Sequence, residues 1–345
     1  MLLDRESKVI TMKMITVLLI LIPVLLSAGS FSKVGTTAAP FLKIGVGARA
    51  VALGGNFVAL ADDPSALYWN PAGITGLKKM SVSGTHTKWF ADITHDAAIF
   101  VTPLGRVSAI GIDLIYLNSG DIEQTTLDEQ DGNGIFYDVS DLALGLTYAR
   151  QLTDRFSVGV KGKYIRQSLF NEQASTFAVD FGTIFDTGFK GLRIGMNLAN
   201  FGGNMQMDGS DLSVVQEDPF SGELIENRRK TESWPLPVIF RVGIAMDILG
   251  ADEAMMQSRD NRLTLAIDGN HPNDNYETIG AGLEYMWNKI LALRLGYKNN
   301  HDVEKFSYGG GLNLTLAGWR FQFDYAYADL SDLDQVQRFT VGIMF

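Results

Sequence analysis

The chain contains the stretch Trp-Arg-Phe-Gln-Phe-Asp-Tyr-Ala-Tyr-Ala over residues 319–328. Every second residue is aromatic, and the residues between them are polar or small. Successive side chains of a β-strand point to opposite faces, so a period of two predicts a strand with one apolar face. We therefore expect a fold that gives one side of this strand a continuous apolar environment.

The same alternation recurs almost throughout Met80 to Phe345. Many of the segments are longer than the roughly 5–6 residues usual in globular strands. They suit a tilted membrane strand, which needs about 9–11 residues. We expect about fourteen strands, near residues 80–90, 95–102, 105–117, 139–150, 155–166, 176–186, 191–200, 236–248, 261–270, 276–287, 291–298, 305–316, 319–328 and 336–345.

The connections between these segments alternate in length. Tight turns are expected near 103–105, 152–154, 287–289 and 317–318, and longer polar loops at 118–138, 167–175, 200–235, 299–304 and 329–335. Outer-membrane barrels have short periplasmic turns and long outer loops. A soluble β-sandwich also alternates, but the strand lengths and this parity favour a transmembrane antiparallel β-barrel. The segment 250–260 is longer than the parity predicts.

The C-terminus is itself an alternating strand that ends in an aromatic residue. Its apolar positions are Phe339, Val341, Ile343 and Phe345. This pattern resembles the C-terminal signal that the bacterial barrel-assembly machinery reads. The assembly machinery and outer-membrane lipid are therefore expected partners.

The N-terminus has the pattern of a secretory signal peptide. Lys13 precedes an apolar run from Ile15 to Leu26, and small residues follow from Ser27 to Ser30. The run is shorter than the roughly 20 residues that span a bilayer. We expect residues 1–30 to be removed on export, with Met12 as a possible start and with Gly29 or Phe31 as the mature N-terminus.

Composition excludes several function classes. The net charge of −10 argues against nucleic acid as a partner, because phosphate binding requires an excess of Lys and Arg. The absence of cysteine removes disulfides, thiolate metal sites and cysteine nucleophiles. The 36 glycines predict many turns and close backbone contacts.

Residues 31–79 are rich in Gly and Ala and lack sustained alternation. Gly45 to Ala50 fits the dinucleotide fingerprint G-x-G-x-x-A, but that motif acts only inside a βαβ unit, and no such series follows it. We therefore expect tight packing of a small-residue segment and no cofactor. Asp63-Pro64 predicts a helix start with Asp63 as the N-cap, and Asn70-Pro71 predicts its end, leaving a short helix over Ser65 to Trp69.

The same region resembles the PorV/PorQ family of outer-membrane proteins. The resemblance rests on Gly45 to Gly73 and above all on Arg49, Gly54, Gly55, Asp62, Asp63, Trp69, Asn70, Pro71 and Ala72. The family is similar to the FadL-type transporters, and this similarity implies a fourteen-stranded barrel with an N-terminal hatch in its lumen. The resemblance thus implies a hatch over residues 31–79 and a barrel over 80–345, with no catalytic residues.

Charged residues on the less apolar strand faces are expected to point into the lumen, because a lipid-facing charge costs about 2–4 kcal/mol at the midplane. There they would pair with each other or with Arg49, Asp62 and Asp63. These residues are Lys161, Lys163, Asp180, Arg193, Arg241, Asp247, Asp268, Arg294, Arg320 and Asp324.

Enzyme and metal motifs are absent from the sequence. The four histidines, His86, His95, His271 and His301, are scattered, and no H-E-x-x-H or G-x-S-x-G motif occurs. The acidic loop 128–134 offers oxygen ligands for calcium, but it lacks EF-hand spacing, so we interpret it as a solvated loop. We expect neither a metal site nor an enzyme.

Two function classes remain. The resemblance implies a role in type IX-like protein secretion and surface attachment, with secreted cargo and other secretion components as partners. The alternative is FadL-like transport of small hydrophobic compounds across the outer membrane. The loop 200–235 mixes apolar residues with many charges, which fits a hydrophobic ligand or a partner protein equally.

Overall fold

A computed structural model describes residues 34–345 except 218–219, 221–222, 252, 301–303 and 331–334. The expected signal peptide and the mature N-terminus lie outside the described residues. No helix among the described residues is long and apolar enough to cross a membrane.

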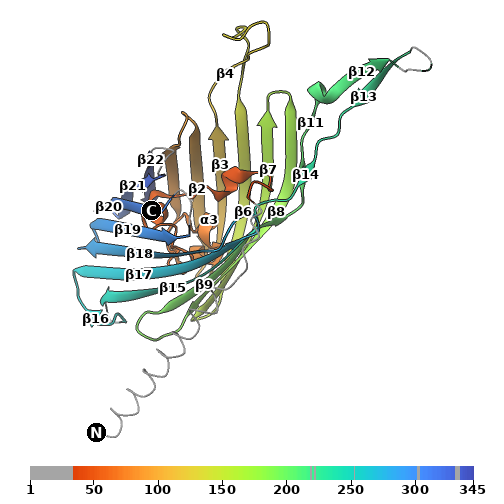
Figure 1. The fold of residues 1–345 in the computed structure, drawn as a ribbon. Coiled ribbons are helices and arrows are strands. Elements are labelled where there is room, and N and C mark those ends of the chain that lie inside the picture. Colours follow the sequence, from red (N-terminus) through yellow and green to blue (C-terminus); the bar gives the residue numbers. More distant parts are fainter. Residues whose placement is uncertain (1–33, 218–219, 221–222, 252, 301–303, 331–334) are drawn as a thin grey trace, which may run out of the picture. The chain divides into compact units, whose positions relative to one another are not determined.

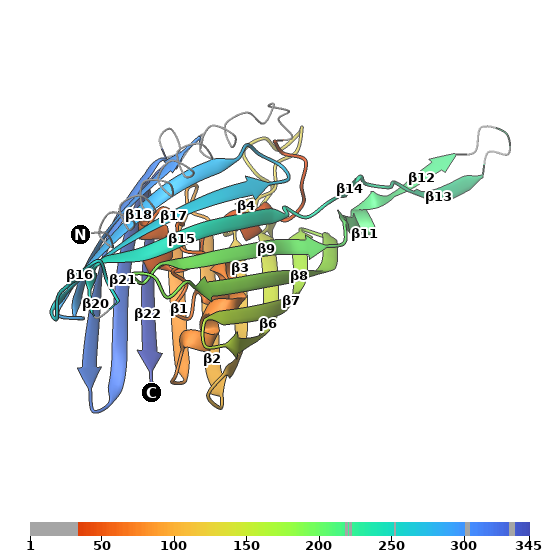
Figure 2. The same cartoon turned by 90° about the horizontal axis from the view of Figure 1, so that it is seen from below.

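Fourteen antiparallel strands form one closed sheet, curved around a common interior (Figures 1 and 2). The sheet closes where β1 pairs with both β2 and β22. All fourteen strands match the alternating segments of the sequence. They are β1 (Ser81–Lys88), β2 (Thr94–Leu104), β3 (Ser108–Asn118), β6 (Val139–Thr153), β7 (Phe156–Leu169), β8 (Glu172–Asp186), β9 (Arg193–Gly202), β15 (Ile239–Gly250), β17 (Asn261–Pro272), β18 (Thr278–Trp287), β19 (Leu291–Asn299), β20 (Phe306–Leu316), β21 (Trp319–Asp329) and β22 (Gln335–Met344).

The apolar side chains of these strands point outward. In β6, Leu144, Leu146 and Tyr148 are 47%, 57% and 48% exposed, whereas Ala143 and Thr147 between and beside them are buried. This direction is the reverse of that in a soluble protein, where large apolar side chains are buried. It is the arrangement of a barrel whose outer surface meets lipid.

The loops follow the expected parity with one correction. Tight turns join β2 to β3 and β20 to β21, and hairpins of short strands occupy the long loops at the other end. The expected loop at 167–175 is wrong, because β7 continues to Leu169 and β8 begins at Glu172. The polar residues there pair across the two strands, for example Ser168 with Gln173.

The long loops contain the remaining short elements. One loop holds the hairpin β4 (Ile122–Glu123) and β5 (Phe136–Tyr137), and another holds the hairpin β12 (Ser213–Glu217) and β13 (Leu224–Arg228), which projects away from the barrel (Figures 1 and 2). The atypical segment 250–260 contains β16 (Met256–Gln257), which pairs with the end of β15. The others are β10 (Met205–Gln206), β11 (Asp208–Gly209), η3 (Ser210–Leu212) and β14 (Ser233–Trp234).

The N-terminal segment, residues 34–79, forms four short helices, which are η1 (Pro40–Lys43), α2 (Ala48–Ala52), α3 (Ala66–Trp69) and η2 (Pro71–Gly76). Helix α2 packs against β19 to β22, whereas η2 packs against β3, β6, β7 and β8. Because these strands lie in different parts of the closed sheet, the segment lies in the barrel interior. Its small residues, such as Ala48, Ala50 and Ala52, are 0% exposed, so the expected tight packing is confirmed.

The predicted short helix is present, with a correction at its start. Helix α3 begins at Ala66 with Ser65 as its N-cap residue, two positions after the expected Asp63. The Asp63 carboxylate still accepts hydrogen bonds at this end, from the Ser65 backbone N–H at 2.9 Å and the Ser65 hydroxyl at 2.6 Å. Its other oxygen faces Arg49, which fixes the Asp63 side chain ahead of the helix.

Candidate functional site in the barrel interior

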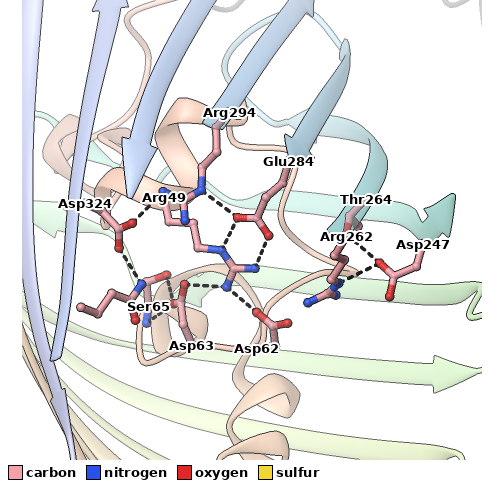
Figure 3. Close-up of polar contacts among 11 residues, drawn as sticks. Arg49, Asp62, Asp63, Ser65, Asp247, Arg262, Thr264, Glu284, Arg294 and Asp324 are labelled. Carbon is pink, nitrogen blue, oxygen red and sulfur yellow. Dashed lines mark hydrogen bonds and ion pairs between the residues drawn. The ribbon is translucent and has the colours of Figure 1, made fainter. Parts of the chain in front are cut away.

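Arg49 is the centre of a buried charge network that joins the N-terminal segment to the barrel wall (Figure 3). Its Nε and Nη2 atoms donate to the two carboxylate oxygens of Glu284 in β18, at 2.8 and 2.9 Å. Its Nη1 atom donates to Asp62 and, at 3.1 Å, to Asp63. A bidentate pair of this kind is stronger and more directional than a single contact.

The network continues along the barrel wall through Arg294 in β19. Its Nε donates to Glu284 at 2.7 Å, and its Nη1 donates to Asp324 in β21 at 2.6 Å (Figure 3). Arg294 and Glu284 are 2% and 1% exposed. Two arginines therefore share one buried glutamate, and three further carboxylates, Asp62, Asp63 and Asp324, also pair with them.

Three acid–base groups of the N-terminal segment respond differently to this burial. Burial lowers the pKa of Arg49, but the charges of Asp62, Glu284 and Asp63 outweigh that effect and hold it above its ordinary value. Burial raises the pKa of Asp62, but the charges of Arg49, Arg262 and Arg193 together lower this pKa by more, so the net shift is downward. For Asp63 burial dominates, and its pKa is raised.

The other predicted hatch residues hold the segment by backbone contacts. The Trp69 indole N–H donates to the Val46 carbonyl at 2.8 Å, and the Asn70 amide donates to the carbonyls of Val58 at 2.8 Å and Thr183 at 3.0 Å. Asn70 thus connects the part of the segment around Val58 and the start of η2 to strand β8. Pro71 and Ala72 follow at the start of η2, and both are buried.

Glycines allow the segment to approach the barrel wall at backbone distance. Gly54 and Gly55 both have positive φ, at 68° and 70°, a conformation that strains other residues. A Cβ atom built on Gly296 of β19 would lie 2.0 Å from the Gly54 backbone nitrogen. The close backbone contacts expected from the glycine content are therefore present here.

The charges expected in the lumen are mostly buried and paired. Lys161 Nζ lies 2.7 Å from Asp113, and Lys163 Nζ lies 2.8 Å from Asp180. Asp268 accepts the Val58 backbone N–H at 2.9 Å. Arg320 differs, since it is exposed at the end of the barrel that carries the tight turns.

The predicted C-terminal signal residues lie elsewhere, on the outer surface of β22. Phe339 and Val341 are 50% and 47% exposed, and Phe345 packs against Trp319 with ring centroids 5.4 Å apart. They do not meet the Arg49 network. No group of three or more His, Asp or Glu side chains in the described part of the chain is arranged to hold a metal ion.

Glu284 is the main residue of the network that the sequence did not single out. It occupies the less apolar face of an alternating segment, opposite Leu283 and Tyr285, and that position is its only signal. Nothing local in the sequence pairs it with Arg49.

The protein-family model described as type IX secretion system protein PorV matches residues 28–218 of this chain. The chain belongs to the PorV family. The matched part spans the whole described N-terminal segment and the first seven barrel strands. No relative among curated protein sequences matches this PorV-family chain.

Solved structures with a similar fold include two described as toluene transporters and one described as a FadL homologue. The toluene transporter TbuX of Ralstonia pickettii is 14% identical, with a TM-score of 0.54 over 87% of this chain and 97% of that one. A FadL homologue of Pseudomonas aeruginosa is 10% identical, with a TM-score of 0.52 over 87% and 98%. The Pseudomonas putida toluene transporter TodX is 12% identical, with a TM-score of 0.50 over 81% and 92%. This PorV-family protein is an outer-membrane β-barrel whose fold is similar to that of these three proteins.

Proposed function

We propose that this protein handles secreted cargo for a type IX-like secretion system and helps to pass it to the cell surface. The observation that carries the proposal is membership of the PorV family, whose model matches residues 28–218. Cargo proteins and other secretion components are then its partners, beside outer-membrane lipid and the barrel-assembly machinery.

The outer end of the barrel offers surfaces suited to a protein partner. The end opposite the tight turns faces outward, since periplasmic turns are the short ones. There the hairpin β12–β13 exposes Val215 and Leu224, at 64% and 75%, and the loop around β4–β5 exposes Leu127 at 93%. Large apolar side chains exposed in loops support an interaction role.

A second candidate function is transport of small hydrophobic compounds. The fold similarity to TbuX and TodX, both described as toluene transporters, favours it. In this function the N-terminal segment and the barrel interior would form the route.

Under both functions we infer that residues 31–79 act as a hatch that closes the pore. The interior position of the described part, the Arg49–Glu284 pair and the Asn70 contacts to β8 support this role. We further infer that the protein has no catalytic activity, in keeping with a secretion family and with transporters of the same fold.

Deletion of the gene separates the two functions. We expect the secreted proteome to lose surface-attached proteins while toluene uptake remains at the parental level. Complementation with a variant in which Gly-Ser residues replace 213–228 should fail to restore secretion. The same replacement of 250–260, at the opposite end of the barrel, should restore it. Loss of toluene uptake with an unchanged secreted proteome would favour the transport function.

A further inference from the structure

The connection 250–260 lies at the end of the barrel that carries the tight turns, and it is longer than the other connections there. It stays close to the barrel, because β16 pairs with the end of β15 and the Ser258 backbone N–H donates to the Gly250 carbonyl at 2.6 Å. Gly250 and Ser258 line a cavity of about 300 Å³, and Arg320 of β21 lines it as well. The long connection therefore forms one wall of a cavity at this end of the barrel.

A second cavity, of about 360 Å³, adjoins the first. Both are lined by Asp62, Arg320 and Met344, and the second is also lined by Lys78 and Lys79, which precede β1. We call the two cavities together the inner mouth. Because the short turns of an outer-membrane barrel are periplasmic, the inner mouth faces the periplasm.

Cations dominate the charged residues that line the inner mouth, with eight cations and three carboxylates. Three of the cations already pair with carboxylates, and they are Arg49, Arg262 and Arg294. The other five are exposed and have no ion-pair partner among the described residues, and they are Lys78, Lys79, Arg259, Lys289 and Arg320. Among the described lining residues, Asp260 is the one exposed carboxylate that stands against these five.

The hydrogen bonds of the two lysines leave their charge in place. Lys78 Nζ donates to the Thr75 carbonyl at 2.8 Å, and Lys79 Nζ donates to the Gly318 carbonyl at 2.7 Å. A neutral carbonyl holds an ammonium group in position but brings no negative charge, and an ammonium has three donors. Both lysines are therefore held at the inner mouth with donors left for an anion.

The carboxylates of the buried network do not reverse this balance. Asp62 and Asp63 line the inner mouth, but both accept from Arg49. Three further carboxylates pair with the lining arginines without lining the mouth, and they are Glu284, Asp324 and Asp247. With these three added to the three that line it, the cations still outnumber the carboxylates by eight to six.

The opposite end of the barrel has the reverse charge. The outer loop 119–138 holds six carboxylates and no Lys or Arg, and the whole chain has a net charge of −10. The cations of the inner mouth are therefore a local concentration in an acidic protein. A field of this kind attracts an anionic partner to the periplasmic end and repels it from the outer end.

We propose that the inner mouth binds an acidic peptide segment of a periplasmic protein. Its five exposed cations come from four parts of the chain and surround two adjoining cavities, so they fit carboxylates spaced along an extended chain better than one compact anion. Asn313 adds an amide that pairs with peptide groups, and Met286 and Met344 add adaptable apolar surface. The inference is independent of cargo handling, since it rests on the charges and cavities of this end alone.

The probe for this site is a short rhodamine-labelled peptide of alternating glutamate and serine. It is added to the full-length barrel in a non-ionic detergent, and fluorescence anisotropy reports binding. We expect saturable binding that weakens at least tenfold when the salt concentration rises from about 0.05 M to 0.5 M, because salt screens exposed charges. The matched peptide, with glutamine in place of each glutamate, should bind at least tenfold more weakly.

A pair of double variants locates the site. Lys289→Gln combined with Arg320→Gln removes two cations of the inner mouth and should weaken binding of the glutamate peptide about tenfold, since each exposed ion pair contributes modestly. Arg106→Gln combined with Lys190→Gln is the matched control. It removes the same charge from two exposed turns at the same end of the barrel, which line neither cavity, and should bind within about twofold of the parent.

Heat-modifiable migration on gels confirms that each variant is folded. Should the Lys289 and Arg320 variant not assemble, the comparison of the glutamate and glutamine peptides on unmodified protein still decides the matter. Equal binding of the two peptides, no saturable binding, or an equal loss in the control variant would overturn the proposal. Tighter binding of a uronic-acid oligomer with the same number of carboxylates would also overturn it, because the site would then suit a carbohydrate polymer.

Discussion

Arg49 and Glu284 are 235 positions apart in the chain and meet in a bidentate ion pair with distances of 2.8 and 2.9 Å. One residue belongs to the N-terminal segment and the other to barrel strand β18. The pair is buried, with Arg49 8% and Glu284 1% exposed. It therefore links the two parts of the proposed pore by a contact that depends on both charges.

The first prediction concerns Arg49→Ala. Removing one partner of a buried pair costs about 3–5 kcal/mol in a dry site, and less beside a wet lumen. The variant leaves Glu284, Asp62 and Asp63 without this cation, so we expect a loosened segment and a higher ion conductance in planar bilayers. The barrel itself should still assemble.

Two further variants serve as comparisons for the conductance of Arg49→Ala. Deletion of residues 31–60 should raise conductance further, because it removes most of the segment. Arg106→Ala, in an exposed turn, removes the same kind of charge far from the pair and should conduct like the parent. Equal conductance for the parent, Arg49→Ala and the deletion would mean that the segment does not close the pore.

The second prediction concerns the close contact between the backbones of Gly296 in β19 and Gly54 in the N-terminal segment. A Cβ atom there would lie 2.0 Å from the Gly54 nitrogen, and backbone atoms cannot move aside as a flexible side chain does. Overpacking typically costs about 1–3 kcal/mol, so Gly296→Ala should lower the urea midpoint and expose the segment to protease. Gly342→Ala is the matched control, since its nearest neighbour would lie at an ordinary 3.6 Å. Similar protease sensitivity in both variants would contradict this account.

The barrel could be predicted from the sequence because the signal for each strand lies in residues that are neighbours in the chain. Each strand can be recognised from the alternation of apolar and polar residues along it, as in Trp319 to Ala328. The number of strands is then the number of such segments. The alternation of short and long loops then indicates which end of the barrel faces the periplasm. The one misplaced loop, at 167–175, shows the limit of this approach, since polar residues there continue the ladder between β7 and β8 instead of leaving it.

The interior was only partly predictable, because its contacts join residues far apart in the chain. Arg49, Asp62 and Asp63 were identifiable from the family motif. In the structure both aspartates pair with Arg49, and Arg49 contacts the barrel wall at Glu284, a residue outside the set of expected lumen charges. The identity of the barrel partner, Glu284, depends on strand register and on how the segment enters the lumen. Thr87, His95 and Arg338 likewise become neighbours only once β22 pairs with β1.

The third prediction concerns the opposite pKa shifts of two adjacent aspartates. The pKa of Asp62 is lowered, so its stabilisation is present above the ordinary value of 3.8 and is lost as the pH falls below it. The pKa of Asp63 is raised, so its contribution is largest at low pH and is lost as the pH rises through the shifted value. At pH 7, Asp62→Asn should therefore destabilise the segment more than Asp63→Asn.

Urea midpoints at pH 7 and pH 3 check this third prediction. The difference between the parent and Asp62→Asn should shrink at pH 3, because pH 3 lies below the ordinary Asp pKa of 3.8 and the stabilisation that comes from the lowered pKa is reduced there. A difference that stays constant, or an Asp63→Asn variant that costs as much as Asp62→Asn at pH 7, would argue against the assigned shifts.

The last prediction concerns Phe345, the terminal aromatic of the proposed assembly signal. Its backbone N–H donates to the Met80 carbonyl at 3.0 Å, and its ring lies 5.4 Å from that of Trp319, so it completes the seam where β22 meets β1 and β21. Phe345→Asp, or truncation of Phe345, should reduce the amount of heat-modifiable barrel in the outer membrane. Leu127→Asp places the same charge on a side chain that is 93% exposed in an outer loop, and it should assemble at the parental level. An unchanged level of folded barrel for Phe345→Asp would place the assembly signal elsewhere in the chain.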